Sequence, residues 1–261
     1  MKFKLSILVT LALLVFFLPT HAVETKYRVM KLINKGWIKG RVTHSNANLE
    51  MPKLEVTRDA QSCGSEARKI EAVSLSSDGG LQNSVVYLKD ISAGKDFTMH
   101  GEPPVLKQNH CNYEPHVQIV PSMSSIKVEN NDSLLHSVHA FWFPYGSKFV
   151  LYPSSVTYPA KTLFNIAMVA QRKESFQQLG ASGIVKFICE AGHYWMTAYA
   201  IIGYNPYFVK VDDNGNYTLE DVPPGKYTVV SWHEYFGTKE QQITVKENQP
   251  TQVDFQYSEE L

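Results

Sequence analysis

The sequence lacks an excess of charge of either sign and has few charged residues. Lys and Arg number 25, Asp and Glu also number 25, and together they make up 19% of the 261 residues. This balance leaves no basic field to hold a nucleic acid or an anionic membrane, so neither is expected as a partner. With 44% apolar and 12% aromatic residues, the chain also differs from disordered proteins and coiled coils.

Cysteine is scarce as well. The chain has only Cys63, Cys111 and Cys189. Three cysteines are too few for a disulfide scaffold, and their odd number leaves at least one thiol unpaired.

No window beyond the N-terminus shows a long apolar run at helical spacing. At the N-terminus two lysines flank the start of an apolar run from Leu5 to Leu18, followed by Thr-His-Ala at 20–22. A membrane-spanning helix needs about 20 apolar residues, so this shorter run predicts a secretory signal cleaved near Ala22, with an uncleaved anchor as the alternative. The mature protein is then expected in the periplasm or outside the cell, without stable membrane insertion.

Short strands are predicted for most of the mature chain. β-branched and aromatic stretches alternate with polar residues and are interrupted by Gly, Pro, Asn and Asp. The clearest stretches are 37–42, 84–88, 126–129, 183–188 and 227–232. Strands of this length and spacing are typical of an all-β sandwich or barrel. A short helix or a long loop is expected only for residues 161–180.

Histidines and turns divide the mature chain into parts. Residues 105–205 hold five of the nine histidines and two of the three cysteines. Residues 206–261 form a compact unit of strands joined by Asp-Asn-Gly and Pro-Pro-Gly turns. Because so short a unit is marginally stable alone, we expect it to pair with the N-terminal β segment, residues 23–104. The histidine-rich part would then be inserted between the two halves of one sandwich.

One short segment combines a thiolate, an imidazole and a thioether. Cys189, His193 and Met196 follow a predicted strand and lie on a turn that contains glycine, which can direct all three side chains to one centre. Soft sulfur donors with imidazole select copper, and one Cys, two His and a weak axial Met form the blue-copper electron-transfer site. The alternative is a buried cysteine, a surface histidine and a core methionine. A second imidazole is required, and His136 supplies it on an upstream strand.

In this combination the sequence resembles the cupredoxin superfamily. In plastocyanin-like members a strand, an Asn-Asn-Asp type of turn and a His-Asn-Val segment carry the first ligand, and a Cys…His…Met loop carries the others. The resemblance implies a Greek-key sandwich over residues 105–205 that binds one copper ion through His136, Cys189, His193 and Met196. The loop spacing also resembles half of the binuclear copper loop of cytochrome oxidase subunit II. That loop has a further cysteine where this chain has Val185, which favours one copper ion.

A wider resemblance spans almost the whole mature chain. Exported bacterial proteins that pair a cupredoxin-like domain with a carboxypeptidase-regulatory-like (transthyretin-type, or prealbumin-like) β-sandwich share several landmarks with it. Those landmarks are Cys63-Gly64, residues 80–89, Cys111, Pro115-His116-Val117, the histidines at 136 and 139, Pro206-Tyr207-Phe208 and Trp232-His233-Glu234. The resemblance implies an all-β protein with two sandwiches. In those proteins the copper loop is usually one residue shorter between its cysteine and histidine.

With Cys189 assigned to the metal, Cys63 and Cys111 are expected to form a disulfide between the inserted domain and the first sandwich half. Two free buried thiols are the alternative. His139 lies three residues after His136 and would face the other side of a regular strand, so it is kept only as an accessory metal ligand or as part of a second site. His116 lies on an alternating strand and could be an accessory ligand, a hydrogen-bond partner of a ligand, or a half-buried residue. His233 is expected to be a hydrogen-bonded structural residue, and His44, His100 and His110 are expected in loops.

The favoured function is one-electron transfer through a mononuclear, type 1-like copper, with redox partners that the sequence does not identify. His193 would be the electron entry point if its edge reaches solvent, and Tyr194 and Trp195 beside it would offer an apolar docking rim. The alternatives are copper storage, delivery or sensing, and a metal-free scaffold or adhesion sandwich of the cell envelope. No enzyme is expected, because the sequence shows no Ser-His-Asp set, no nucleophile elbow and no histidine cluster for a second copper.

Overall fold

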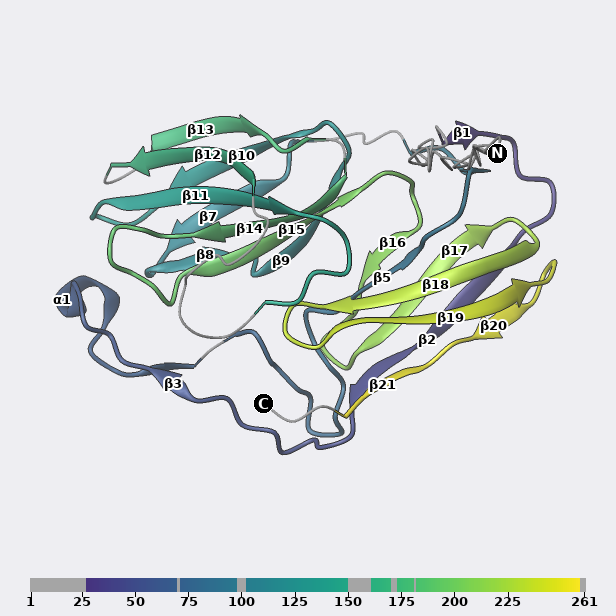
Figure 1. Ribbon diagram of the computed structural model, residues 1–261, viewed down its shortest axis with the longest axis horizontal. Helices are drawn as coiled ribbons and strands as arrows, with labels where there is room; N and C mark the ends of the chain where they lie inside the picture. The colour runs from purple at the N-terminus through teal and green to yellow at the C-terminus, as the bar shows by residue number, and fades with distance from the viewer. Residues whose placement is uncertain are drawn as a thin grey trace, which may run out of the picture.

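The computed structural model describes residues 27–69, 71–97, 102–149, 161–169, 173–180 and 182–258. The predicted signal peptide and His100 lie outside the described residues. Within those ranges the regular structure is almost entirely β, arranged as two sandwiches side by side (Figure 1). One short helix, α1 (Ala60–Cys63), is present in the described part, and no helix there is long and apolar enough to span a membrane.

The first sandwich covers most of residues 105–203 and has two sheets. One sheet is ordered β13 (Lys173–Gln178), β10 (Ser125–Asn130), β7 (Val105–Asn109) and β8 (Asn112–Glu114). The other is ordered β12 (Lys161–Met168), β11 (His136–Phe143), β14 (Gly183–Ile188), β15 (Thr197–Gly203) and β9 (Val117–Pro121). Two of the strand pairs are parallel, β10 with β7 and β15 with β9. Each sheet is therefore mixed, with one parallel pair among antiparallel pairs. The chain crosses from the first sheet to the second after β8.

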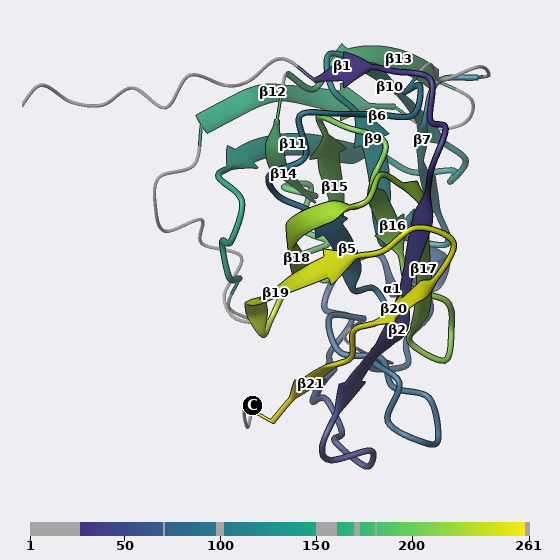
Figure 2. The ribbon, with the colours of Figure 1, turned by 90° about the vertical axis from the view of Figure 1, so that its right-hand side faces the viewer.

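The second sandwich is built from both ends of the described chain. One sheet is ordered β16 (Phe208–Lys210), β5 (Val85–Leu88), β18 (Gly225–His233) and β19 (Gly237–Val245). The other is ordered β17 (Asn216–Val222), β2 (Gly36–His44) and β20 (Pro250–Gln252), and β21 (Phe255–Tyr257) also pairs with β2. Figure 2 shows β2 running beside β20 and β21. Strands from before residue 89 thus pair with strands from after residue 207, and the first sandwich is inserted between β5 and β16.

The two sandwiches share a packed interface, which explains the composition of the central strand β14. All six of its residues are buried. Val185 and Phe187 face the core between the two sheets of the first sandwich, whereas Ile184 belongs to a second apolar cluster with Val230 and Trp232 of β18. Because β14 is covered on both faces, apolar residues occupy neighbouring positions, 184–185 and 187–188, on either side of Lys186 and do not alternate with polar ones.

The expectation of a helix or loop over residues 161–180 is wrong. Where this stretch is described, it forms β12 and β13. β12 is an edge strand with several exposed positions, so it lacks the apolar alternation that would identify a strand. Its pairing with β11, from His136↔Met168 to Trp142↔Lys161, determines its conformation instead.

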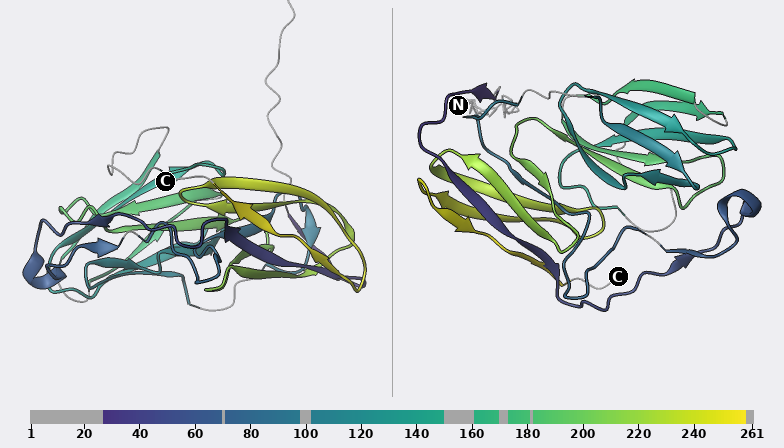
Figure 3. Two further views of the ribbon diagram at one scale, coloured as in Figure 1. Left: turned by 90° about the horizontal axis from the view of Figure 1, so that it is seen from below. Right: turned by 180° about the vertical axis from the view of Figure 1, so that it is seen from behind.

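A segment of the N-terminal half leaves the second sandwich and reaches the far end of the first. We call residues 53–69 the arm; it contains β3 (Lys53–Leu54), α1 and β4 (Arg68–Lys69), with β3 and β4 paired antiparallel. Figure 3 shows it from behind, extending past the first sandwich. The expected disulfide joins Cys63 of the arm to Cys111 in the turn between β7 and β8. A short parallel pair, β1 (Arg28–Val29) with β6 (Ala93–Gly94), completes the described structure.

Candidate metal centre

Two neighbouring strands bring distant residues together at one end of the first sandwich. His136 is the first residue of β11, and Cys189 directly follows the last residue of β14. The two strands pair antiparallel, with His139 opposite Ile188, so the start of one lies beside the end of the other. The Cys189 Sγ atom therefore lies 4.0 Å from the Nδ1 atom of His136 across 53 residues of sequence.

The loop between β14 and β15 supplies the second imidazole. Gly192 has φ +99°, in the left-handed region that favours glycine, and the chain turns there before His193. The Nδ1 atom of His193 lies 3.6 Å from the Cys189 Sγ atom. Met196 ends the loop, is fully buried, and donates its backbone amide to the His193 carbonyl at 2.9 Å. The loop is thus folded back on itself between the imidazole and the thioether.

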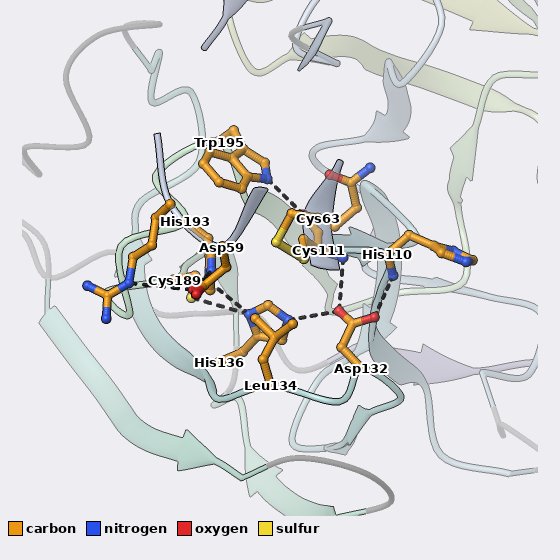
Figure 4. Close-up of a disulfide and its surroundings, with 12 residues drawn as sticks. Asp59, Cys63, His110, Cys111, Asp132, Leu134, His136, Cys189, His193 and Trp195 are labelled. Carbon is orange, nitrogen blue, oxygen red and sulfur yellow. Dashed lines mark hydrogen bonds and ion pairs between the residues drawn. A yellow bond between two sulfur atoms is a disulfide. The ribbon is translucent and has the colours of Figure 1, made fainter. Parts of the chain in front are cut away.

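Three donor atoms converge in a buried position. The two Nδ1 atoms of His136 and His193 are 3.0 Å apart, and both face the Cys189 sulfur (Figure 4). These three residues form a group whose ligand atoms all lie within 4.8 Å of one another. A second such group contains Cys111, Asp132 and His136, but the sulfur of Cys111 is bonded to Cys63 and offers no thiolate. The thiolate–imidazole group is therefore the candidate centre in the described residues.

The outer nitrogen of each imidazole is bonded to a carboxylate. His136 Nε2 lies 2.8 Å from Asp132 Oδ2, and His193 Nε2 lies 2.9 Å from Asp59 Oδ2. In each pair the carboxylate accepts a hydrogen bond from Nε2–H. This bond fixes the orientation of the ring and leaves Nδ1 directed at the centre. Both imidazoles are thus oriented as metal ligands.

The environment of Cys189 favours the thiolate. Burial raises the pKa of this thiol, but hydrogen bonds from His136, His193 and the amides of Ser137 and Ala191 outweigh it and lower the pKa to about 5. The Ser137 amide lies 3.4 Å from the sulfur. Burial lowers the pKa of His193, but Cys189 and Asp59 outweigh burial and raise it. The contacts of the metal-free centre therefore favour the thiolate form of Cys189, which is the form that binds a metal ion.

The chemistry of this donor set fits copper. One thiolate and two imidazoles combine soft and borderline donors, which copper favours, whereas a structural zinc site takes four strong ligands. The donors are enclosed: His136 and His193 are 0% exposed and Cys189 is 5% exposed. Because two neighbouring strands of one sheet and a folded-back loop fix the three residues, the centre is pre-organised for a single ion.

The two histidines kept as accessory ligands lie apart from this centre and have other partners. His139 faces the other side of β11, with Nδ1 2.9 Å from Glu190 Oε1 and Nε2 3.1 Å from Thr162 Oγ1. His116 is buried between the sandwiches, where Nε2 is paired with Glu234 and Nδ1 lies 3.1 Å from the Thr197 carbonyl. Neither belongs to the groups whose atoms converge.

The remaining histidines serve structural roles where they are described. His233 is buried and accepts hydrogen bonds at Nδ1 from the amides of Tyr235 and Phe236. His110 lies in the turn between β7 and β8, as expected. His44 was expected in a loop, but it is the last residue of β2 and stacks on Phe236 with ring centroids 4.9 Å apart. The strand extends this far because β21 pairs with its end, as far as His44↔Tyr257.

The ring edge of His193 does not reach solvent, because the arm covers it through Asp59. The condition for electron entry at this edge is therefore not met. Trp195 does not form an exposed rim either: it is 8% exposed and donates its ring N–H to the Cys111 carbonyl. Sequence reasoning missed both carboxylates. Asp132 lies in the Asn-Asn-Asp turn four residues before His136 and had a recognisable context, whereas Asp59 is 134 residues from His193 and belongs to no motif.

Comparison with known proteins gives a family for one part of the chain. Residues 203–258 match the family model of the carboxypeptidase regulatory-like domain. No curated protein matches the chain.

Solved cupredoxins are similar to about two fifths of the chain. A reduced copper(I) form of an amicyanin variant has 13% identity and a TM-score of 0.29, covering 40% of this chain and 86% of that one. A purple cupredoxin from Nitrosopumilus maritimus has 15% identity and a TM-score of 0.30, covering 38% of this chain and 99% of that one. A copper-containing nitrite reductase from Thermus scotoductus has 13% identity and a TM-score of 0.28, covering 40% of this chain and 23% of that one.

The candidate centre is defined by the convergence of its three donor atoms. The chain combines two β-sandwiches, and residues 203–258, which contribute strands to the second, match the family model of the carboxypeptidase regulatory-like domain.

Proposed function

We propose that this protein binds one copper ion, which His136, Cys189 and His193 would hold with Met196 as a weaker fourth ligand, and that it transfers single electrons outside the cytoplasm. The observation that carries the proposal is the convergence of one sulfur and two Nδ1 atoms within 4.8 Å at a buried strand end. Copper bound there would supply a one-electron couple between its two oxidation states.

The protein's own groups favour such a couple. The thiol of Cys189 has a pKa of about 5, so the sulfur is a thiolate at neutral pH without a metal. The Ser137 amide, 3.4 Å from the sulfur, holds it in place. Asp132 and Asp59 fix the two rings at their outer nitrogens. Because the donors are held from outside, a change in oxidation state requires little rearrangement.

Copper storage or delivery is the second candidate, and one observation favours it. His193 is fully buried beneath the arm, so the ring edge that would exchange electrons with a partner does not reach solvent. A covered ligand suits retention of a metal better than rapid exchange of electrons at that edge. In either case the proposed protein is a carrier and not an enzyme, and the Cys63–Cys111 disulfide suits the periplasmic or secreted location that we propose.

A titration of the purified mature protein with Cu(II), followed by visible absorption, tests the proposal. We expect an intense thiolate-to-copper charge-transfer band that saturates at one equivalent. A protein that stays colourless and retains a metal-free Cys189 thiol would overturn the proposal and favour the metal-free scaffold.

Two rates separate the candidate functions. Electron transfer predicts that a small-molecule reductant bleaches the band much faster than a copper chelator removes the metal. Storage or delivery predicts slow reduction together with transfer of the ion to a competing chelator.

A further inference from the structure

We propose that Asp59 is a positioning residue for His193 and that the arm is a latch, locked by the Cys63–Cys111 disulfide, which closes the metal centre. The inference rests on the proposed function, because it assigns a role to residues around the copper ligands. It concerns residues outside the first sandwich and a covalent bond distant from the donor atoms in sequence.

The Asp59 side chain bonds His193 and does not cap the helix that it precedes. It is the N-cap of α1, where an aspartate side chain usually accepts a hydrogen bond from an amide of the first helical turn. Its side chain makes no such bond, and its carboxylate lies 2.9 Å from His193 Nε2 instead. The side chain is 44% exposed, so burial does not force this contact. The backbone carbonyl alone accepts the amides of Ser62 and Cys63, at 2.9 and 2.8 Å.

The disulfide joins the two chain segments that contact Asp59 and Asp132, the aspartates whose carboxylates hold the two imidazoles. On one side, the amide of Cys63 bonds the carbonyl of Asp59. On the other, the amide of Cys111 lies 2.9 Å from Asp132 Oδ2, the same oxygen that bonds His136 Nε2. Figure 4 shows the bridge between these two aspartates, with the histidines facing the Cys189 sulfur. One covalent bond therefore closes a ring of contacts around the centre.

Other contacts hold the arm on both sides of α1, to the turn between β7 and β8 and to the ligand loop. Arg68 donates to the Asn112 side chain at 2.9 Å and to the His110 carbonyl at 2.8 Å. Before the helix, Tyr194 donates its hydroxyl to the Glu55 carbonyl. A Cβ atom added to Gly192 would lie 2.5 Å from the Arg58 side chain, so the arm lies directly against this loop position, whose φ of +99° favours glycine. Together these contacts explain why His193 is fully buried.

A chelator competition in copper-loaded protein tests the latch. We would measure copper release into excess chelator for wild type, Asp59→Asn, Asp59→Ala and the double variant Cys63→Ser/Cys111→Ser. Removal of an outer-sphere carboxylate typically weakens metal binding by about 10-fold to 100-fold, and we expect release to accelerate by that factor in Asp59→Ala and in the double variant. Asp59→Asn, which keeps an acceptor oxygen, should show a smaller increase. Asp213→Ala, an exposed aspartate of the second sandwich, is the matched control and should leave the rate unchanged.

A second readout needs no metal. In the metal-free protein at pH 8, iodoacetamide should alkylate the buried Cys189 faster in Asp59→Ala and in the double variant than in wild type or Asp213→Ala, because an opened arm uncovers the centre. Equal release and equal alkylation in wild type and Asp59→Ala would overturn the latch. If wild type binds no copper, the proposed function fails, whereas the alkylation rates still decide whether the arm closes over Cys189.

Discussion

The two imidazoles of the candidate centre are held in contrasting ways. His136 begins a strand, and its carboxylate partner, Asp132, lies four residues upstream in the same sandwich. His193 lies on a loop, and its partner, Asp59, comes from 134 residues upstream on an arm that belongs to neither sandwich. The His136 side is therefore built into the fold, whereas the His193 side depends on a separate segment. The comparison suggests that geometry at the centre and access to it are controlled by different parts of the chain.

The largest expected effect comes from removing the Cys189 sulfur, which both imidazoles face. Cys189→Ser should abolish the charge-transfer band with Cu(II), because the thiolate is the donor of that transition. Circular dichroism of the metal-free variant should stay close to wild type, since the strands of the sandwich form without the sulfur, whereas its thermal unfolding should lose only the contribution of the thiolate. A variant that kept its spectrum would place the metal elsewhere.

Breaking the covalent link between the two sides should cost more stability than removing either carboxylate. The disulfide spans 48 residues, and the chain-entropy model predicts a loss of about 4 kcal/mol in the free energy of unfolding for Cys63→Ser/Cys111→Ser. Urea denaturation of the metal-free proteins measures this loss. An unchanged midpoint would show that the bridge does not constrain the unfolded chain.

The carboxylates should differ from each other in the same assay. Asp132 accepts the amides of His110 and Cys111 besides the ring of His136, and its side chain is 12% exposed. Asp132→Ala leaves these donors without a partner and should lower the free energy of unfolding by about 1–3 kcal/mol. Asp59→Ala removes a half-exposed contact and should cost clearly less. Equal losses would contradict the contrast between a built-in side and a latched side.

The pH dependence of the thiol sharpens the comparison further. Because the pKa of Cys189 is lowered from 9.0 to about 5, the folded protein loses its thiol proton at lower pH than the unfolded chain does. This thiolate contribution to stability is fully present above pH 9 and falls as the pH drops from 9 to 5. Alkylation of the metal-free protein should accordingly show a midpoint near pH 5 when folded and near pH 9 in denaturant. A folded midpoint near 9 would show that the imidazoles do not stabilise the thiolate.

The smallest expected effect is that of substituting His139, which is close to His136 in sequence but lies on the opposite face of β11. His139 pairs with Glu190 on the opposite side of β11 from His136. His139→Ala should change neither the copper spectrum nor the release rate. A change in either would show that the accessory histidine contributes to the centre.

Local sequence patterns predicted much of the fold and the three residues that converge at the centre, but neither of the carboxylates that hold the imidazoles. Alternating or neighbouring apolar residues indicated β10 and β14, and the His136 and Cys189 motifs lie at strand ends as their patterns suggested. The edge strand β12 was missed because its exposed positions interrupt the alternation, and pairing with β11 decides its structure. Asp59 was not predictable, since an aspartate before a four-residue helix reads as a helix cap and only the tertiary path of the arm brings it to His193.

A crystal structure of the copper-loaded protein tests the central claim most directly. The account predicts one copper ion bonded to the Nδ1 atoms of His136 and His193 and to the Cys189 sulfur, with Asp59 and Asp132 still bonded to the outer ring nitrogens. Copper bound elsewhere, or through one imidazole with Asp59 swung away from His193, would contradict it.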